Sequence, residues 1–344
     1  MKTITLGVIS LLLAFAAAAQ TEKPYLTKSF AGANIQNAEV ETSGGGIQVT
    51  GGDPSQARVE VYVNGNGHTL SADEIKERLE KYYDVVISLE GGKLSAKARP
   101  KGAFHDLWSD GNSLSISFHV FVPKAVSTHL NTSGGGIHLQ NLQGTEEFET
   151  SGGGLHLDGL SGKIHGRTSG GGIEVSNSND DINLSTSGGG IHANHCTGNI
   201  RLETSGGSLE LNDLSGKIEA GTSGGGIHGS RVSGDLSVST SGGSIHFSDL
   251  SCTLDASTSG GGIDVTMVSI GKSIQLNTSA GGISLHLPSG KGLDLALSGQ
   301  RVETSNLANF SGTTEKYRVN GSVNGGGIPV RLSANSGTVR VAFD

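Results

Sequence analysis

Histidine and carboxylate side chains recur at one position of a repeated hexapeptide. The hexapeptide reads T-S-G-G-[GS]-[IL], and eight copies begin every eighteen residues from Thr132 to Thr258. The sixth residue after each threonine forms a column that consists of His138, His156, Glu174, His192, Glu210, His228, His246 and Asp264. Imidazole and carboxylate groups are common zinc ligands, and imidazole changes charge at roughly pH 6. The column could therefore bind a divalent metal weakly or respond to pH.

The spacing of this column limits the metal hypothesis. Neighbours on a flat strand ladder lie about 4.8 Å apart, and such a line rarely brings three or four ligands to one point. A polar outer face that tolerates histidine is the simpler explanation. We therefore predict no catalytic, cofactor-binding or metal-binding residue and no cofactor. Whether the column binds metal or senses pH stays open at this stage.

The repeat also predicts the elements that carry the column. The interval does not vary over seven repeats, so each unit follows the same backbone path and the units can stack on one axis. Within a unit, apolar and polar residues alternate, which is strand periodicity. The fifth residue after each threonine is always Ile or Leu, as at Ile173, Ile191 and Leu209. These patterns predict an all-β fold, a parallel β-solenoid of about eighteen residues per coil.

Two turns complete each predicted coil. The Gly-Gly-Gly stretch is predicted to need positive φ, which glycine adopts without steric cost. The other turn carries a Ser-Gly pair, as at Ser161-Gly162 and Ser215-Gly216. A variant hexapeptide at Thr278 and an outlying copy at Thr42 extend the array in both directions.

The two ends of the chain depart from the period. Residues 38–49 match one coil that about seventy inserted residues separate from the array. Within the insertion, Ser71 and Glu74 fit a capping box for a helix from Ala72 to about Tyr83. Alternating runs predict strands at Arg58–Val63, Val85–Leu89 and Leu114–Val122. We predict one β-solenoid domain over 20–344, with a lead-in coil and capping insertion at 20–130, regular coils at 131–287 and irregular terminal coils at 288–344.

Residues 1–19 have the pattern of a secretory signal peptide. A basic Lys2 precedes an apolar run from Ile4 to Phe15, and small residues end at Ala19. The run is shorter than the roughly 20 apolar residues of a spanning helix. We therefore expect cleavage after Ala19 and no transmembrane segment in the mature chain. The expected location is the periplasm, the outer membrane surface or the extracellular space.

Charge argues against a nucleic-acid partner, and the positions of the two cysteines argue against a disulfide. The formal net charge is −8 without a block of basic residues, which argues against a nucleic-acid partner because phosphate contacts require a basic face. Cys196 falls in a core column and Cys252 at a predicted turn three coils later. Their predicted separation of about 14 Å is too large for a disulfide.

The carboxylate pairs do not predict an enzyme. Glu146-Glu147 and Asp180-Asp181 fall at predicted turns or outward positions, with no aromatic residues close by that would bind a sugar. Glycoside hydrolysis needs two carboxyl groups about 5–9.5 Å apart across a substrate. Calcium-binding nonapeptide repeats are excluded, because an inward apolar residue replaces their aspartate. We predict a non-catalytic protein.

Aromatic residues gather in the inserted segment. They include Tyr82, Tyr83, Phe104, Trp108, Phe118 and Phe121. One interpretation is a plug over the first coil. The other is a ligand-binding patch that includes Trp108, because aromatic side chains combine a large apolar surface with defined geometry.

Taken together, these features resemble a bacterial family of unknown function whose members carry the label "putative adhesin". The shared features are the signal peptide, the lead-in coil, a strand that ends in Val122-Pro123 and the S-G-G-G-I repeats. The resemblance covers residues 30–343 and implies a right-handed parallel β-helix in the cell envelope. It supplies no catalytic residue. It implies an adhesin-like scaffold or binding module whose partner is an unknown protein or glycan of the envelope. The alternative is a glycan-binding or glycan-active solenoid that uses the aromatic N-terminal segment.

Overall fold

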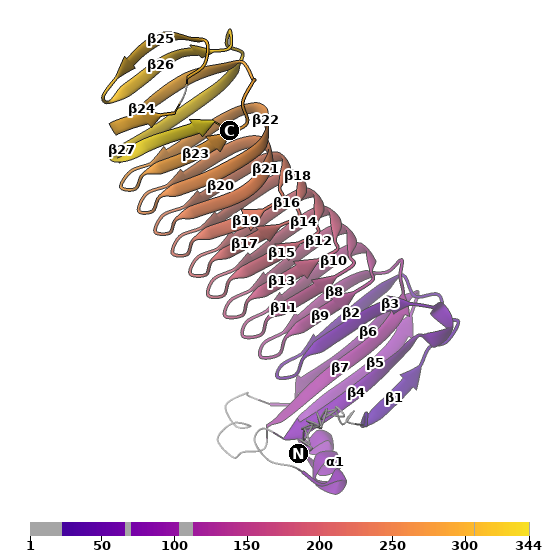
Figure 1. Ribbon diagram of the computed structural model, residues 1–344. Helices are drawn as coiled ribbons and strands as arrows, with labels where there is room; N and C mark the ends of the chain where they lie inside the picture. Colours follow the sequence, from indigo (N-terminus) through magenta and orange to yellow (C-terminus); the bar gives the residue numbers. More distant parts are fainter. Residues whose placement is uncertain (1–22, 66–69, 103–112, 306, 344) are drawn as a thin grey trace, which may run out of the picture.

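The computed structural model describes residues 23–65, 70–102, 113–305 and 307–343. The predicted signal peptide lies outside these residues, as do Phe104 and Trp108. The described chain is an elongated all-β rod of stacked strands, with the N-terminal segment at one end and the C-terminal strands at the other (Figure 1). It has the shape of a solenoid.

Each regular coil contributes one strand of four residues and one of eight. The short strands are β9 (Ile137–Gln140), β11 (Leu155–Asp158), β13 (Ile173–Ser176), β15 (Ile191–Asn194), β17 (Leu209–Asn212) and β19 (Ile227–Ser230). The long strands are β10 (Gln143–Thr150), β12 (Ser161–Thr168), β14 (Asn179–Thr186), β16 (Thr197–Thr204), β18 (Ser215–Thr222) and β20 (Ser233–Thr240), and β8 (Ser127–Thr132) precedes them.

Strands of one kind pair in parallel along the rod. β11 pairs with β9 and β13, and β12 pairs with β10 and β14. Each residue lies opposite the residue eighteen positions further on, as Ile173 lies opposite Ile191 and Ile191 opposite Leu209. These three side chains are buried. They stack as nearest neighbours in one interior column, as the sequence period predicts.

The threonine that opens each hexapeptide is buried and joins adjacent coils. Thr168 Oγ1 donates a hydrogen bond of 2.7 Å to the carbonyl oxygen of Gly153 in the preceding coil, and it accepts one of 3.2 Å from the N–H of Gly171. The bond to a glycine carbonyl recurs in every coil from Thr132 to Thr278. A buried polar group without a partner costs about 1–3 kcal/mol. Threonine therefore stabilises the contact between adjacent coils more than an apolar residue would.

The glycines of the hexapeptide allow close approach between coils. A Cβ added at Gly153 would lie 2.1 Å from the carbonyl oxygen of Gly135, so a side chain does not fit there. The prediction of positive φ is wrong for this stretch. Described residues with positive φ include Gly162 and Gly216 of the second turn, at 103° and 119°, but no glycine of the regular hexapeptides.

The N-terminal segment adds layers to one end of the rod. Its elements are β1 (Leu26–Ser29), β2 (Asn37–Thr42), β3 (Ile47–Gly52), η1 (Pro54–Gln56), β4 (Arg58–Gly65), α1 (Ala72–Tyr82), β5 (Tyr83–Glu90), β6 (Lys93–Pro100) and β7 (Leu114–Pro123). β2 and β3 pair in parallel with β8 and β9, with Thr42 opposite Thr132. The lead-in coil therefore lies directly on the first regular coil.

The inserted residues cover the lead-in coil. β6 pairs with β2 and β7 with β3, and antiparallel β5, β4 and β1 follow outward. The predicted capping box is present, since Ser71 and Glu74 bond to each other's backbone at the start of α1. Figure 1 places α1 at the tip of the rod, beside β4 and β5.

The C-terminal end is less regular. Its strands are β21 (Ile245–Thr258), β22 (Ile263–Thr278), β23 (Ile283–Leu287), β24 (Leu293–Thr304), β25 (Phe310–Glu315), β26 (Arg318–Val323) and β27 (Ile328–Phe343). Along β21 and β22 the pairing interval increases, so that Leu254 lies opposite Ile274. β27 pairs in parallel with β22, β23 and β24, while β24, β26 and β25 form an antiparallel extension.

Two side chains are buried where the sequence pattern predicts another position. Glu146 is fully buried, and the prediction of a turn or outward position is wrong because β10 carries it into an interior column opposite Ile164. Cys252 is also buried rather than at a turn, because β21 continues through this position. Cys196 and Cys252 are both free thiols, as predicted.

Candidate functional site

The structure places the histidine and carboxylate column on one outer face of the rod. The strands β9, β11, β13, β15, β17, β19, β21 and β22 each contribute their second residue, and the registers place each member opposite the next. All of these side chains are exposed. Alternation along each strand fixes this direction, because the preceding Ile or Leu points inward. We call this column the ladder.

Neighbouring members of the ladder form pairs. The rings of His138 and His156 stack with centroids 4.6 Å apart. His156 Nδ1 lies 3.2 Å from Glu174 Oε2, and His192 Nδ1 lies 2.9 Å from Glu210 Oε2. Within the ranges that the structure describes, no group of three or more histidine, cysteine or carboxylate side chains is placed to hold a metal ion. His156 takes part in two of these contacts, so the ladder offers a run of three groups and, further along, a separate imidazole–carboxylate pair.

The stacked pair affects the charge of one ladder histidine. Partial burial lowers the pKa of His138, and the neighbouring His156 and His119 lower it further. The physical cause is that burial and like charges both disfavour the imidazolium form. The neutral form of His138 is therefore favoured, and a neutral imidazole can accept a hydrogen bond from a ligand on this face.

The ladder borders a shallow cleft of about 460 Å³ across β15, β17, β19 and β21. Its lining includes His192, Glu210, Asn212, His228, Ser230 and His246. Imidazole, carboxylate, amide and hydroxyl groups give this surface both donors and acceptors. It is suited to a polar ligand that lies across several coils.

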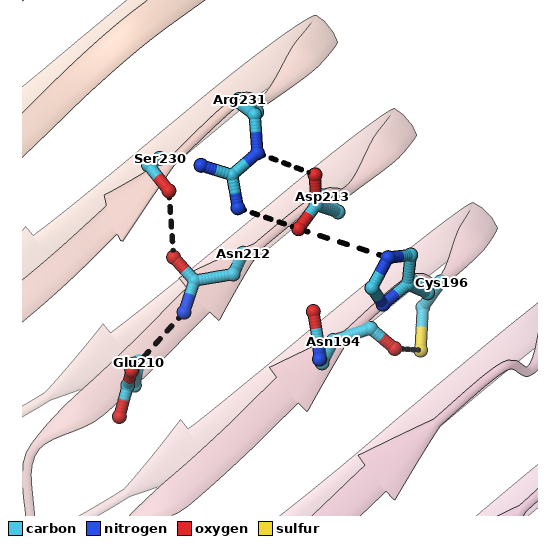
Figure 2. Close-up of polar contacts among 8 residues, drawn as sticks. Asn194, Cys196, Glu210, Asn212, Asp213, Ser230 and Arg231 are labelled. Atoms are coloured by element: carbon cyan, nitrogen blue, oxygen red, sulfur yellow. Dashed lines mark hydrogen bonds and ion pairs between the residues drawn. The ribbon is translucent and has the colours of Figure 1, made fainter.

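A second polar column lies at the corner where these strands end (Figure 2). Asn212 Nδ2 donates a hydrogen bond of 3.1 Å to Glu210 Oε1, and Ser230 Oγ donates one of 3.0 Å to Asn212 Oδ1. Arg231 donates two hydrogen bonds of 2.6 and 2.7 Å to the Asp213 carboxylate. These bonds from Arg231 hold the pKa of Asp213 below its usual range. The corner extends the polar surface beside the cleft.

This corner column was not predicted from the sequence. Successive coils place His195, Asp213 and Arg231 there in the left-handed conformation, with φ of 52°, 55° and 54°. Most residues with a Cβ avoid this conformation, although Asn and Asp tolerate it. Asn141 and Asn177 occupy the same position of the repeat, and asparagine there indicates a left-handed residue. The later coils carry histidine, aspartate and arginine at this position, so the indication is weak.

The aromatic residues of the inserted segment divide between the core and the outer face. Phe118 and Tyr83 are buried, and the Tyr83 hydroxyl accepts a hydrogen bond of 2.9 Å from the Leu114 N–H. These two residues therefore belong to the core at the end of the rod. Trp108 and Phe104, which the ligand-patch interpretation includes, lie outside the described residues.

A cluster on the outer face of β4 and β7 combines aromatic and charged groups. The rings of Tyr62 and His119 have centroids 4.4 Å apart, and the Arg58 guanidinium lies 3.6 Å from the Phe121 ring centroid. Glu60 accepts hydrogen bonds from Arg58 and Tyr62 at 2.7 and 2.9 Å. We call these five residues the Tyr62 cluster. They are half-buried, so part of each ring and polar group remains accessible.

Comparison with known proteins identifies a family and two solved structures. A putative cell adhesion protein from Clostridium sporogenes ATCC 15579 is 9% identical, with 93% of this chain and 98% of that chain covered and a TM-score of 0.20. A putative adhesin from Bacteroides fragilis NCTC 9343 is 10% identical, with 93% and 96% covered and a TM-score of 0.21. These scores are too low to support a functional argument. No curated protein matches the chain.

The described part of the chain contains no helix that is both long and apolar enough to cross a membrane. The family model described as Toastrack DUF4097 matches residues 18–342. This match spans the lead-in coil, the insertion, the regular coils and the irregular C-terminal strands. The chain therefore belongs to the Toastrack DUF4097 family.

Proposed function

We propose that this protein is an exported, non-catalytic component of the cell envelope that acts as an adhesin-like scaffold or binding module. The observation that carries the proposal is the continuous parallel register from β10 to β20. This register aligns polar side chains into columns along a rigid rod, with one group per strand spacing of about 4.8 Å. A preorganised surface loses little conformational entropy when it binds an extended partner.

The proposal includes a right-handed winding and about eighteen residues per coil. Registers that join residues eighteen apart support the coil length, as between His156 and Glu174. The handedness follows from a general rule, since crossovers between parallel strands of one sheet are right-handed in nearly all proteins.

The proposed partner is a protein or glycan of the envelope, and the proposed binding surface is the cleft beside the ladder. The formal net charge of −8 disfavours nucleic acid. The signal-peptide pattern at residues 1–19 supports export to the periplasm, the outer membrane surface or the outside of the cell.

A binding experiment with a matched control tests this function. Immobilised protein is incubated with envelope extract, alongside a cleft variant with His192→Ala, His228→Ala and His246→Ala. The control variant carries Asn183→Ala and Asn199→Ala, which lie on the outer faces of β14 and β16. We expect wild type and control to retain the same envelope component and the cleft variant to lose it. Equal retention by all three proteins would assign binding to another surface.

The Tyr62 cluster supports a second candidate, which is glycan binding at the N-terminal end. Aromatic faces beside charged hydrogen-bonding groups suit a sugar, whose rings have apolar faces and polar edges. A glycan array with wild type and Phe121→Ala tests it, with Tyr317→Ala as a control at the other end of the rod, where Tyr317 is 56% exposed. A sugar signal that only Phe121→Ala loses would favour this candidate, whereas identical profiles would exclude it.

A further inference from the structure

One buried carboxyl group lies in an interior column that is apolar from the next coil onward. Glu146 on β10 lies between Thr128 on β8 and Ile164 on β12. The following coils place isoleucine at this position, as at Ile182, Ile200 and Ile218. The Glu146 side chain is completely inaccessible to solvent. The repeat therefore replaces its usual apolar residue with an acid at the first coil interface of the array.

The Glu146 carboxyl group has too few hydrogen-bond partners for its burial. Thr128 Oγ1 donates a hydrogen bond to Oε2, whereas Oε1 has no partner among the described residues. Buried polar atoms of native proteins are nearly always hydrogen-bonded, and an unpaired one is costly. The adjacent Glu147 differs, because it is exposed and pairs with His129.

The surroundings of Glu146 supply no counter-charge. The strands that pair with β10 direct Thr128 and Leu130 of β8, and Ile164 and Thr168 of β12, into the interior. β9 and β11, which share this core, contribute only apolar side chains, namely Ile137, Leu139, Leu155 and Leu157. Glu147 and His129 are the titratable neighbours on β10 and β8, and both face outward. No charged or titratable side chain of the described strands faces the carboxyl group.

This environment determines the protonation state of Glu146. Burial raises its pKa to about 7, and the bonds from Thr128 act in the opposite direction. Below this pH the carboxyl group is neutral and tolerated in the core. Above it, the group ionises where no cation balances it, which is unfavourable in an apolar interior. Opening the β8–β10 interface would let water reach the charge.

We propose that loss of the proton from Glu146 favours opening of the β8–β10 interface, which connects the capped N-terminal segment to the regular coils. We call this interface the joint. The joint stays closed while the carboxyl group holds its proton and opens more often once the proton is lost. Its position gives the opening a structural consequence, since β2 and the inserted layers are attached to the array through β8 and β9. A rod that is continuous in acid would therefore gain a flexible point at alkaline pH.

The size of the effect follows from the two pKa values. In the closed joint the pKa of Glu146 is about 7, and in an open, hydrated joint it returns to 4.5. Between these values the opening equilibrium increases by up to about tenfold per pH unit. From about pH 5 to about pH 8 we therefore expect an increase on the order of 50–100-fold.

Hydrogen exchange followed by mass spectrometry tests the joint. Protection of peptides that cover β8 and β10 is measured at acidic and alkaline pH, corrected for intrinsic exchange, and divided by that of β14 and β16. In wild type we expect this ratio to fall by the predicted factor as pH rises. Glu146→Gln, whose amide does not ionise, should keep the ratio constant. Glu149→Gln, which removes an exposed carboxyl group from the same strand, is the matched control and should behave like wild type.

Two outcomes would overturn the proposal. One is a wild-type ratio that does not change with pH, and the other is a folded Glu146→Gln protein that shows the same fall as wild type. Carbon NMR of wild type labelled at its glutamate carboxyl groups tests the joint even if the variant does not fold. One carboxyl group should titrate near neutral pH, and its absence would contradict the proposal. None of these measurements depends on the partner of the ladder.

Discussion

Replacing the middle glycine of one hexapeptide by alanine tests how closely the coils touch. A Cβ at Gly207 would lie 2.1 Å from the carbonyl oxygen of Gly189, which accepts the 2.7 Å hydrogen bond from Thr204 Oγ1. The coils must then separate locally, at a cost of about 1–3 kcal/mol for overpacking. Weakening the Thr204 bond to this partly buried carbonyl adds about 1–3 kcal/mol. We therefore expect Gly207→Ala to lower the free energy of unfolding by roughly 2–6 kcal/mol.

Two other glycines provide matched controls for this prediction. A Cβ at Gly52 has no neighbouring atom within 4 Å, so Gly52→Ala should leave stability unchanged or raise it by up to about 1 kcal/mol. Gly172 is the third glycine of its hexapeptide, where a Cβ would lie 3.3 Å from the Gly190 carbonyl oxygen. The chain carries serine at this place in Ser208 and Ser244. Gly172→Ser should therefore be tolerated.

Urea unfolding followed by circular dichroism measures all three variants. We expect a large decrease in the unfolding midpoint for Gly207→Ala and small changes for the other two variants, with similar denaturant slopes. If Gly207→Ala and Gly52→Ala unfold at the same urea concentration, the middle glycine does not serve close approach between coils.

Three further substitutions probe other features. Thr168→Val should lower the unfolding free energy by about 1–3 kcal/mol, because it removes the hydrogen bonds to the partly buried backbone groups of Gly153 and Gly171. The same urea assay measures this change, and a wild-type midpoint would contradict the proposed role. The pKa of Glu146 is higher in the folded protein than in the unfolded chain. The contribution of Glu146 to the free energy of unfolding is therefore fully present below about pH 4.5 and is lost as pH rises to about 7. Glu146→Ile should therefore stabilise the protein by up to about 3 kcal/mol at alkaline pH and much less in acid, as unfolding at both pH values would show. Arg231→Ala should leave the urea midpoint close to that of wild type, because the Arg231 side chain is exposed and solvent screens its pair with Asp213. A clear loss of midpoint would show that the corner depends on this pair.

The amino-acid sequence was sufficient to predict the stacking of the regular coils. A constant interval fixes which residues can be neighbours, so the period alone assigns Ile173, Ile191 and Leu209 to one interior column, where they lie. The capping box at Ser71 and Glu74 was equally predictable, because its hydrogen bonds join residues close in sequence.

Other features depend on information that residue type alone does not contain. A pair of acids favours a turn or an outward position for Glu146, yet its distance from Thr150 places it in the inward column. The need for glycine at Gly153 arises from a neighbouring coil and not from its own φ.

The pairing within the ladder was also beyond the sequence. The order of residues shows which histidine and carboxylate side chains occupy neighbouring coils, but side-chain rotamers decide which of them meet. His192 approaches Glu210, while His138 stacks on His156. The sequence therefore predicted the face and its residue types, whereas the structure was needed for the contacts between neighbours and for the cleft beside β17.

The deletion of one whole repeat tests the central claim most directly. Removing residues 186–203 joins Ser185 to Thr204, which occupies the same phase of the period as Thr186. Removing only residues 186–194 shifts every later side chain by half a period. We predict that the longer deletion unfolds cooperatively and keeps the wild-type circular dichroism spectrum, while the shorter one does not fold. Two deletions with the same thermal unfolding curve would contradict the stacked-coil account.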